Sequence, residues 1–281
     1  MKLPWLILAA VGAWAQAPDV AQIMSRVAEN QARSLQLRRF YVYNQKQLLK
    51  MVRGSGKVAR EEHREYFIMP QDSGIKKDLT RFDGKYERHG KFIAYDHPGY
   101  TYKEMDIDGE IIDDMSKDLT DDKGSRDGLC AGLFPLTEKE QKKYQFKFVG
   151  AEDYRGRPVY RVHFEPRQRT SVMDLDDGDA AWKGDALIDT AEYQPVLVTT
   201  KLAVNIPRAV KILLGTNIRG LGFSVTYRKF EDGLWFPVSY GGEFDLRAVF
   251  FYKRMISVSM VNSDFKRADV TSSVAYKIEE Q

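Results

Sequence analysis

Histidines and carboxylates are the residues of this 281-residue chain from which catalysis or metal binding could be built. The histidines are His63, His89, His97 and His163, and none is spaced with a cysteine, an aspartate or a second histidine as zinc ligands usually are. The sequence also lacks the Gly-x-Ser-x-Gly elbow of many hydrolases and a complete phosphate-binding loop. These patterns predict no catalytic residue, no metal ligand and no cofactor, and therefore a protein that is not an enzyme. An exported hydrolase in which His63, His97 or His163 meets a nucleophile or carboxylates in a cleft is the alternative.

A run of carboxylates lies between Lys103 and Arg126, in "KEMDIDGEIIDDMSKDLTDDKGSR". Calcium binding is one interpretation of this run. However, its acidic positions do not follow the EF-hand order, which needs ligands at positions one, three and five and a closing Glu at twelve. Ile107, Ile111 and Ile112 instead follow a partly helical spacing. We therefore expect residues 103–126 to form a solvated acidic flap or a helical insertion.

The first residues have the order of a secretory signal peptide. Lys2 precedes an apolar run that ends at Val11, and the small-x-small triplet closing with Ala15 follows. The run is too short to cross a bilayer, and no later stretch has eighteen consecutive apolar residues. No cysteine follows the run as a lipid-attachment site. We expect cleavage near Ala15 and an exported protein that is periplasmic, or secreted where no outer membrane exists, and that does not span the membrane.

Charge and cysteine content exclude further classes. The formal net charge of +3 is close to balance, which argues against nucleic acid as a partner because nucleic-acid-binding domains concentrate a basic excess. The single cysteine, Cys130, cannot form an internal disulfide. Its apolar neighbours favour a small buried side chain rather than a catalytic thiol.

Only one long helix is expected, in "APDVAQIMSRVAENQARSLQL", with Asp19 as its N-cap. Its apolar residues recur at the three-and-four spacing of a single helix face: Val20, Ile23, Met24, Val27 and Ala28. From Phe40 the apolar period becomes two, and glycine-containing turns such as 53–56 separate successive strands. A second, short helix is expected after Thr137, where Glu140 completes a capping box.

These elements predict a mainly β (α+β) protein with a single domain over residues 16–281. The fold class is a large curved antiparallel sheet, or an incomplete β-barrel, wrapped around the N-terminal amphipathic helix. A curved sheet must fill its concave face with helices, a second sheet or a ligand. With one long helix to cover it, the sheet is expected to enclose a hydrophobic cavity, although a closed sandwich fits the same pattern. Strand alternation gives the candidate ligand-lining residues Ile188, Val196, Val198, Phe223, Val225, Phe236, Val238 and Phe250, with Ile23, Met24 and Val27 as lid candidates.

The order of these features resembles the LolA-like superfamily of periplasmic lipoprotein carriers and outer-membrane lipoprotein-sorting proteins. The resemblance rests on the export signal, the helix "DVAQIMSRVAEN", the hairpin "YVYNQKQLLKMVRGSGKVAREEHREYFIMP" and the pair "WKGDALIDTAEYQPVLVTTKL". It implies a LolA/LolB-like open barrel whose apolar interior accepts acyl chains. The acidic segment and the stretch from Ile206 to Gly220 look like insertions relative to the simplest carrier.

The function expected is that of a soluble periplasmic carrier or chaperone for lipoprotein sorting. Its partner would be a lipid acyl chain or a lipidated protein bound in the concave face. The alternative from another class is an envelope sensor, or an interaction domain that recognises a protein partner with the same scaffold.

Overall fold

The computed structural model describes residues 18–71, 74–118, 136–168, 182–203, 217–219, 222–230, 232–248 and 251–268. The expected signal peptide, Cys130 and Phe250 lie outside these ranges. The helices are α1 (Val20–Arg38), α2 (Ile107–Asp118) and α3 (Glu138–Gln141). The strands are β1 (Tyr41–Arg53), β2 (Val58–Pro70), β3 (Ile75–Arg88), β4 (Lys91–Tyr95), β5 (Tyr144–Tyr154), β6 (Arg157–Pro166), β7 (Trp182–Asp189), β8 (Pro195–Leu202), β9 (Asn217–Arg219), β10 (Ser224–Lys229), β11 (Trp235–Ala248) and β12 (Tyr252–Arg267).

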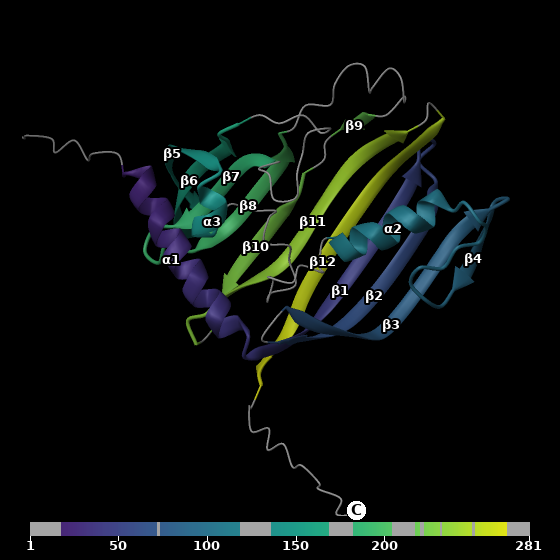
Figure 1. Cartoon of the computed structure of the whole chain (residues 1–281), viewed down its shortest axis with the longest axis horizontal. Helices are drawn as coiled ribbons and strands as arrows, with labels where there is room; N and C mark the ends of the chain where they lie inside the picture. The colour runs from purple at the N-terminus through teal and green to yellow at the C-terminus, as the bar shows by residue number, and fades with distance from the viewer. Residues whose placement is uncertain are drawn as a thin grey trace, which may run out of the picture.

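All of these strands belong to one antiparallel sheet with the order β4-β3-β2-β1-β12-β11-β10-β8-β7-β6-β5, and β9 pairs with β11 beside this path. One wing of the sheet is built from the first four strands and the other from β5 to β8. The three C-terminal strands β10, β11 and β12 lie between the wings and join them (Figure 1). Within the described strands β4 and β5 are free edges, so the sheet is open. The predicted fold class, a large open antiparallel sheet with an N-terminal amphipathic helix packed on it, is confirmed.

The helices lie on one side of the sheet, which we call the helix-covered face (Figure 1). Helix α1 begins where the sequence predicts, because the Asp19 carboxylate accepts a hydrogen bond from the Ala21 amide at 2.9 Å. Its apolar stripe, including Ile23, Met24 and Val27, is buried toward the sheet. Short helix α3 follows Thr137, whose hydroxyl accepts from the Glu140 amide as the capping pattern requires.

The turn between β7 and β8 is fixed by its first residue. The Asp189 carboxylate accepts hydrogen bonds from the amides of Ala191 and Glu192, at 2.9 and 2.7 Å. Tyr193 has a positive φ of 53°, and β8 restarts at Pro195. This side-chain bond to the following amides is the usual reason that aspartate opens a tight turn.

Candidate functional site

An apolar cluster fills the space between the helices and the sheet. Of the predicted lining residues it contains Ile188, Val196, Val198, Phe223 and Val225, which are at most 6% exposed. The three lid candidates on α1 belong to the same cluster, as does Ile112 of α2. The structure therefore brings most of the predicted lining and lid residues together, and their contact with a ligand stays a prediction.

Two of the remaining lining candidates lie elsewhere. Phe236 is buried among other aromatic rings, within 5.3 Å of Tyr41 and 4.6 Å of Phe265 between ring centroids. The pairing of β10 with β11 shifts between Thr226 and Tyr227, which leaves Val238 unpaired in this register. Val238 is half-buried outside the cluster and lines a cavity described below. The bulge breaks the simple alternation on which the prediction for β11 depended.

The C-terminal half of α1 is tied to the β7–β8 turn by polar side chains. Gln31 donates to the Gln194 side chain at 2.7 Å, and Gln194 donates in turn to the Ser34 hydroxyl at 3.3 Å. The Asn30 amide donates to the backbone carbonyl of Glu192 at 2.7 Å. The N-terminal half of the helix is instead held by the apolar contacts of the cluster and by Arg26, whose guanidinium lies 4.6 Å from the centroid of the Tyr193 ring. The two halves of α1 are therefore attached to the sheet by different kinds of interaction.

A cavity of about 490 Å³ lies near the same turn, where β5, β6, β8, β10 and β11 come together. This volume lies within the usual range of small-molecule sites, about 300 to 1,000 Å³. Its lining residues are Tyr154, Arg155, Arg157, Val196, Thr226, Tyr227, Arg228, Lys229, Trp235, Val238 and Ser239. Val196, Tyr227 and Trp235 also belong to the apolar cluster. The cavity and the cluster therefore share a wall.

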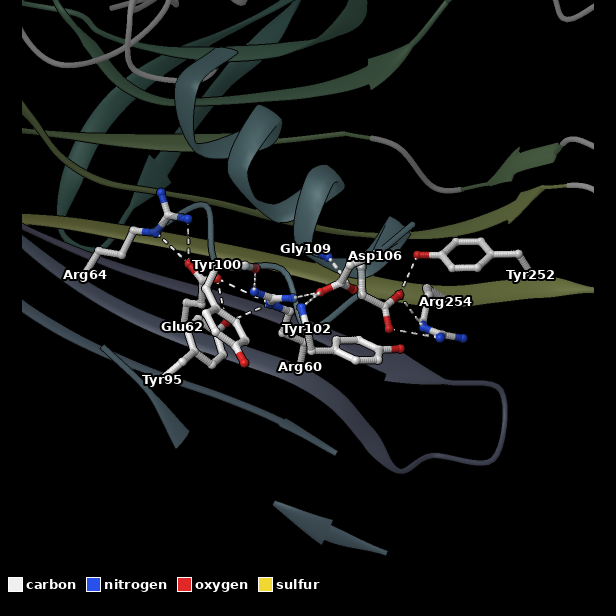
Figure 2. Close-up of polar contacts among 11 residues, drawn as sticks. Arg60, Glu62, Arg64, Tyr95, Tyr100, Tyr102, Asp106, Gly109, Tyr252 and Arg254 are labelled. Carbon is white, nitrogen blue, oxygen red and sulfur yellow. Dashed lines mark hydrogen bonds and ion pairs between the residues drawn. The ribbon is translucent and has the colours of Figure 1, made fainter. Parts of the chain in front are cut away.

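A buried charged network occupies the other wing of the helix-covered face (Figure 2). Arg60, Glu62 and Arg64 alternate along β2 and so point to the same side, and their side chains are 1%, 1% and 3% exposed. Glu62 pairs with both arginines. It also accepts a hydrogen bond at 2.6 Å from the hydroxyl of Tyr95, which itself accepts one from Arg60 at 2.7 Å. Burial of these charges is tolerated because each has partners of opposite sign.

Three aspartates of the acidic segment complete the network. Asp106 accepts from the Arg60 guanidinium at 2.7 Å. It also accepts from the Gly109 amide at 3.2 Å, in the first turn of α2. Asp113 contacts Arg64 at 3.3 Å. Asp108 accepts hydrogen bonds from Arg254 and Tyr252 of β12, at 2.9 and 2.7 Å.

The helical spacing of the acidic segment is confirmed by α2, but the expectation that its acids are solvated is wrong for these three positions. Asp106 is only 1% exposed, and its charged partner Arg60 lies on β2, far away in sequence. The whole group balances four cations with four anions: Arg60, Arg64, Lys117 and Arg254 with Glu62, Asp106, Asp108 and Asp113. The charges therefore attach α2 to the sheet.

The network also shifts ionisation equilibria. Burial, followed by the negative charge of Glu62, raises the pKa of Tyr95, so this phenol stays protonated and donates to Glu62. Burial opposes the charged form of Arg60, but Tyr95, Asp106 and Glu62 outweigh it and raise the pKa of the guanidinium. Burial likewise opposes ionisation of Asp113, but its hydrogen bond with Lys117 and the charge of Arg64 lower its pKa. The groups are therefore held in their charged or donating forms, as structural pairing requires.

Three of the histidines bond to carboxylates outside the cavity and the charged network, although the His97 ring contacts Tyr100 at 5.5 Å between centroids. His63 and His163 lie in strands, as predicted, and their ring nitrogens contact Glu61 at 3.3 Å and Asp185 at 2.8 Å. His97 contacts Asp96 at 2.9 Å. Within the described part of the chain, no hydrogen bond joins these rings to a Ser, Thr or Cys. Among the same described residues, no group of His, Cys, Asp and Glu could hold a metal ion.

The fold and site define an open antiparallel sheet protein with an apolar, helix-covered interior. No known protein-family model matches the chain, and no curated protein matches it. Similar solved structures include a LolA superfamily protein from Nitrosomonas europaea, 10% identical, covering 93% of this chain and 99% of that chain with a TM-score of 0.36. A domain named as an outer membrane lipoprotein-sorting protein from Vibrio parahaemolyticus is 12% identical, covering 89% and 95%, with a TM-score of 0.35. The lipoprotein LppX from Mycobacterium tuberculosis is 7% identical, covering 88% and 96%, with a TM-score of 0.27.

The superfamily that the sequence resembles is thus represented among the structural neighbours, at low identity. Among the helices that the structure describes, none is long and apolar enough to cross a membrane.

Proposed function

We propose that this protein is a periplasmic carrier or chaperone that binds an acyl chain, or a lipidated protein, between α1 and the sheet. Its role would be in the sorting of outer-membrane lipoproteins. The observation that carries the proposal is the shared wall of the apolar cluster and the cavity, formed by Val196, Tyr227 and Trp235. These side chains separate the cavity from the cluster, so an acyl chain that enters the cavity would reach the apolar interior by displacing them.

The energetics favour an exchange of apolar contacts. An acyl chain gains about 0.8 kcal/mol for each methylene that leaves water. It would replace Ile23, Met24 and Val27 against the sheet, while the polar contacts of Gln31 with Gln194 keep the other half of α1 in place. The apolar contacts that the acyl chain makes with the sheet would compensate for those that α1 loses. A single helix can be displaced in this way more readily than a second sheet packed on the first. Release would follow from the return of α1.

Native mass spectrometry and lipid extraction of the purified mature protein test this function. We expect a co-purifying lipid, and binding of a fluorescent fatty acid after the lipid is removed. Val225→Gln, inside the cluster, should weaken binding of the fatty acid about tenfold or more, because a buried polar group would face the chain. Val261→Gln is the matched control, since Val261 is 46% exposed.

Circular dichroism establishes that each variant is folded. If Val225→Gln does not fold, Met24→Gln on α1 replaces it. A folded wild-type protein with neither lipid nor fatty-acid binding would refute the carrier function. Recovery of a protein partner without lipid would favour the interaction-domain alternative.

A further inference from the structure

The cavity beside the β7–β8 turn has an unusual charge distribution. Every charged side chain in its lining is cationic: Arg155, Arg157, Arg228 and Lys229. Such a lining differs from that of the charged network under α2, where cations and anions alternate. An open, water-accessible volume of about 490 Å³ with cations around it is suited to an anionic group.

Two of these cations are already paired. Arg157 contacts Asp189 at 2.7 Å, and Lys229 contacts Glu192 at 2.8 Å. Asp189 is held in its ionised form, because Arg157 and the turn amides outweigh the effect of burial and lower its pKa. The paired acids fix the positions of Arg157 and Lys229 and compensate their charges. The net charge around the cavity therefore depends on the other two arginines.

Arg155 and Arg228 have no carboxylate partner within the described part of the chain. Their guanidinium groups lie over the rings of Tyr154 and Phe230, at 5.2 and 4.9 Å from the centroids. An aromatic face stabilises a cation but leaves its hydrogen-bond donors available. Two arginines without a carboxylate partner in the described residues thus line the same cavity, Arg155 from the β5–β6 turn and Arg228 from β10.

The backbone at Arg155 supports a role for this side chain. Arg155 and Gly156 form the two-residue turn between β5 and β6, with φ values of 56° and 79°. Asparagine, aspartate or glycine is favoured at the first position of such a turn, because glycine has no Cβ to crowd the following carbonyl oxygen, and asparagine and aspartate gain a local hydrogen bond. Arginine at this position is conformationally unfavourable, and it adds a cation to the cavity.

We propose that this cavity binds the anionic headgroup, a phosphate or carboxylate, of an amphiphile whose acyl chain occupies the apolar cluster. The inference rests on the proposed carrier function and names the polar end of its cargo. Val196, Tyr227 and Trp235 connect the two compartments, so one molecule can place its chain under α1 and its charge between Arg155 and Arg228.

Isothermal titration calorimetry with three probes tests the assignment: dodecyl phosphate, dodecanol and inorganic phosphate. We expect dodecyl phosphate to bind the wild-type protein about tenfold more tightly than dodecanol, since hydrogen bonds to charged groups are stronger than neutral ones. This advantage should shrink as salt is raised, because the arginines are exposed. The double variant R155Q/R228Q should lose the advantage and retain its affinity for dodecanol. The matched control R81Q/R267Q removes two exposed arginines outside the cavity lining and should behave as wild type.

The outcomes separate the two proposals. If dodecanol binds and the phosphate adds nothing, the headgroup site is refuted and the carrier function stands. If neither dodecyl probe binds, the carrier function fails and the headgroup site fails with it. If inorganic phosphate binds as tightly as dodecyl phosphate, the site takes a free anion and the lipid assignment is overturned.

Discussion

Replacement of Asp106 gives the sharpest test of how α2 is attached to the sheet. The Asp106 carboxylate is 1% exposed and performs two tasks, because it pairs with Arg60 at 2.7 Å and accepts from the Gly109 amide at 3.2 Å. Asp106→Ala removes both interactions and leaves Arg60 buried with Glu62, at 3.4 Å, as its remaining carboxylate partner.

The magnitude follows from these two tasks. Breaking a buried ion pair costs about 3 to 5 kcal/mol, and the lower end applies because Glu62 still compensates Arg60. Loss of a helix cap costs about 1 kcal/mol more. We therefore expect Asp106→Ala to lower the free energy of unfolding by about 4 kcal/mol. Asp106→Asn keeps an oxygen for only one contact, because Oδ2 accepts from Arg60 and Oδ1 from Gly109. Its NH2 group would face the other donor, so this variant should cost about 3 kcal/mol.

Urea unfolding of the protein, followed by circular dichroism, measures these differences. Asp114→Asn is the control, since Asp114 is exposed on the same helix, and it should stay within about 0.5 kcal/mol of wild type. Hydrogen exchange should show the loss of protection concentrated in α2. If the free energy of unfolding of Asp106→Ala is within about 1 kcal/mol of the wild-type value, the network does not attach α2 to the sheet as described.

Two further predictions concern the sheet. A Cβ added at Gly184 would lie 1.8 Å from the backbone oxygen of Thr199, so Gly184→Ala should lower the free energy of unfolding in urea by about 3 kcal/mol. Gly150→Ala is the control and should be neutral or slightly stabilising, because a Cβ there would have nothing within 4 Å. Equal effects of the two substitutions would contradict the close approach of β7 and β8. Burial opposes ionisation of Glu61, but hydrogen bonds with two lysines and a histidine lower its pKa from 4.5 to about 2. A lowered acid pKa stabilises the folded state above the unfolded pKa, so this stability should be lost as the pH falls from 4.5 toward 2, and Glu61→Gln should show a shallower loss over that range. If Glu61→Gln and the wild-type protein lose stability identically over this pH range, Glu61 is not responsible for the loss.

Local patterns predicted much of the fold. Asp19 and the apolar spacing that follows it specify α1, and Asp189 with Pro195 specifies the turn that α1 contacts. These features depend on residues a few positions apart, where helix capping and turn geometry act. Alternation also identified Val198 and Val225 as interior positions. It was less successful on β11, because a bulge at Val238 changes the alternation without a clear sequence signal.

The charged network could not be predicted from those patterns. Alternating Arg60, Glu62 and Arg64 would ordinarily indicate a solvated strand face, and the aspartates of the acidic segment a solvated surface. Each set is buried only because the other covers it, and Asp106 meets Arg60 across 46 positions of sequence. Tertiary pairing of this kind leaves no periodic signature in either segment. The one signal that could have suggested this pairing is the presence of arginines along a polar strand together with an acidic helix of opposite charge.

The position of β10, β11 and β12 between the two wings has a consequence for synthesis of the chain. Strand β1 has its second neighbour only when β12 is present, although β12 begins at residue 252, and β8 likewise waits for β10. During N-to-C emergence of the chain, both inner edges therefore present unpaired backbone groups until the final quarter of the sequence arrives. Such edges favour intermolecular strand addition, and closure by distant segments is slow. The nascent chain thus needs protection from aggregation until its last hairpin inserts and seals the two halves together.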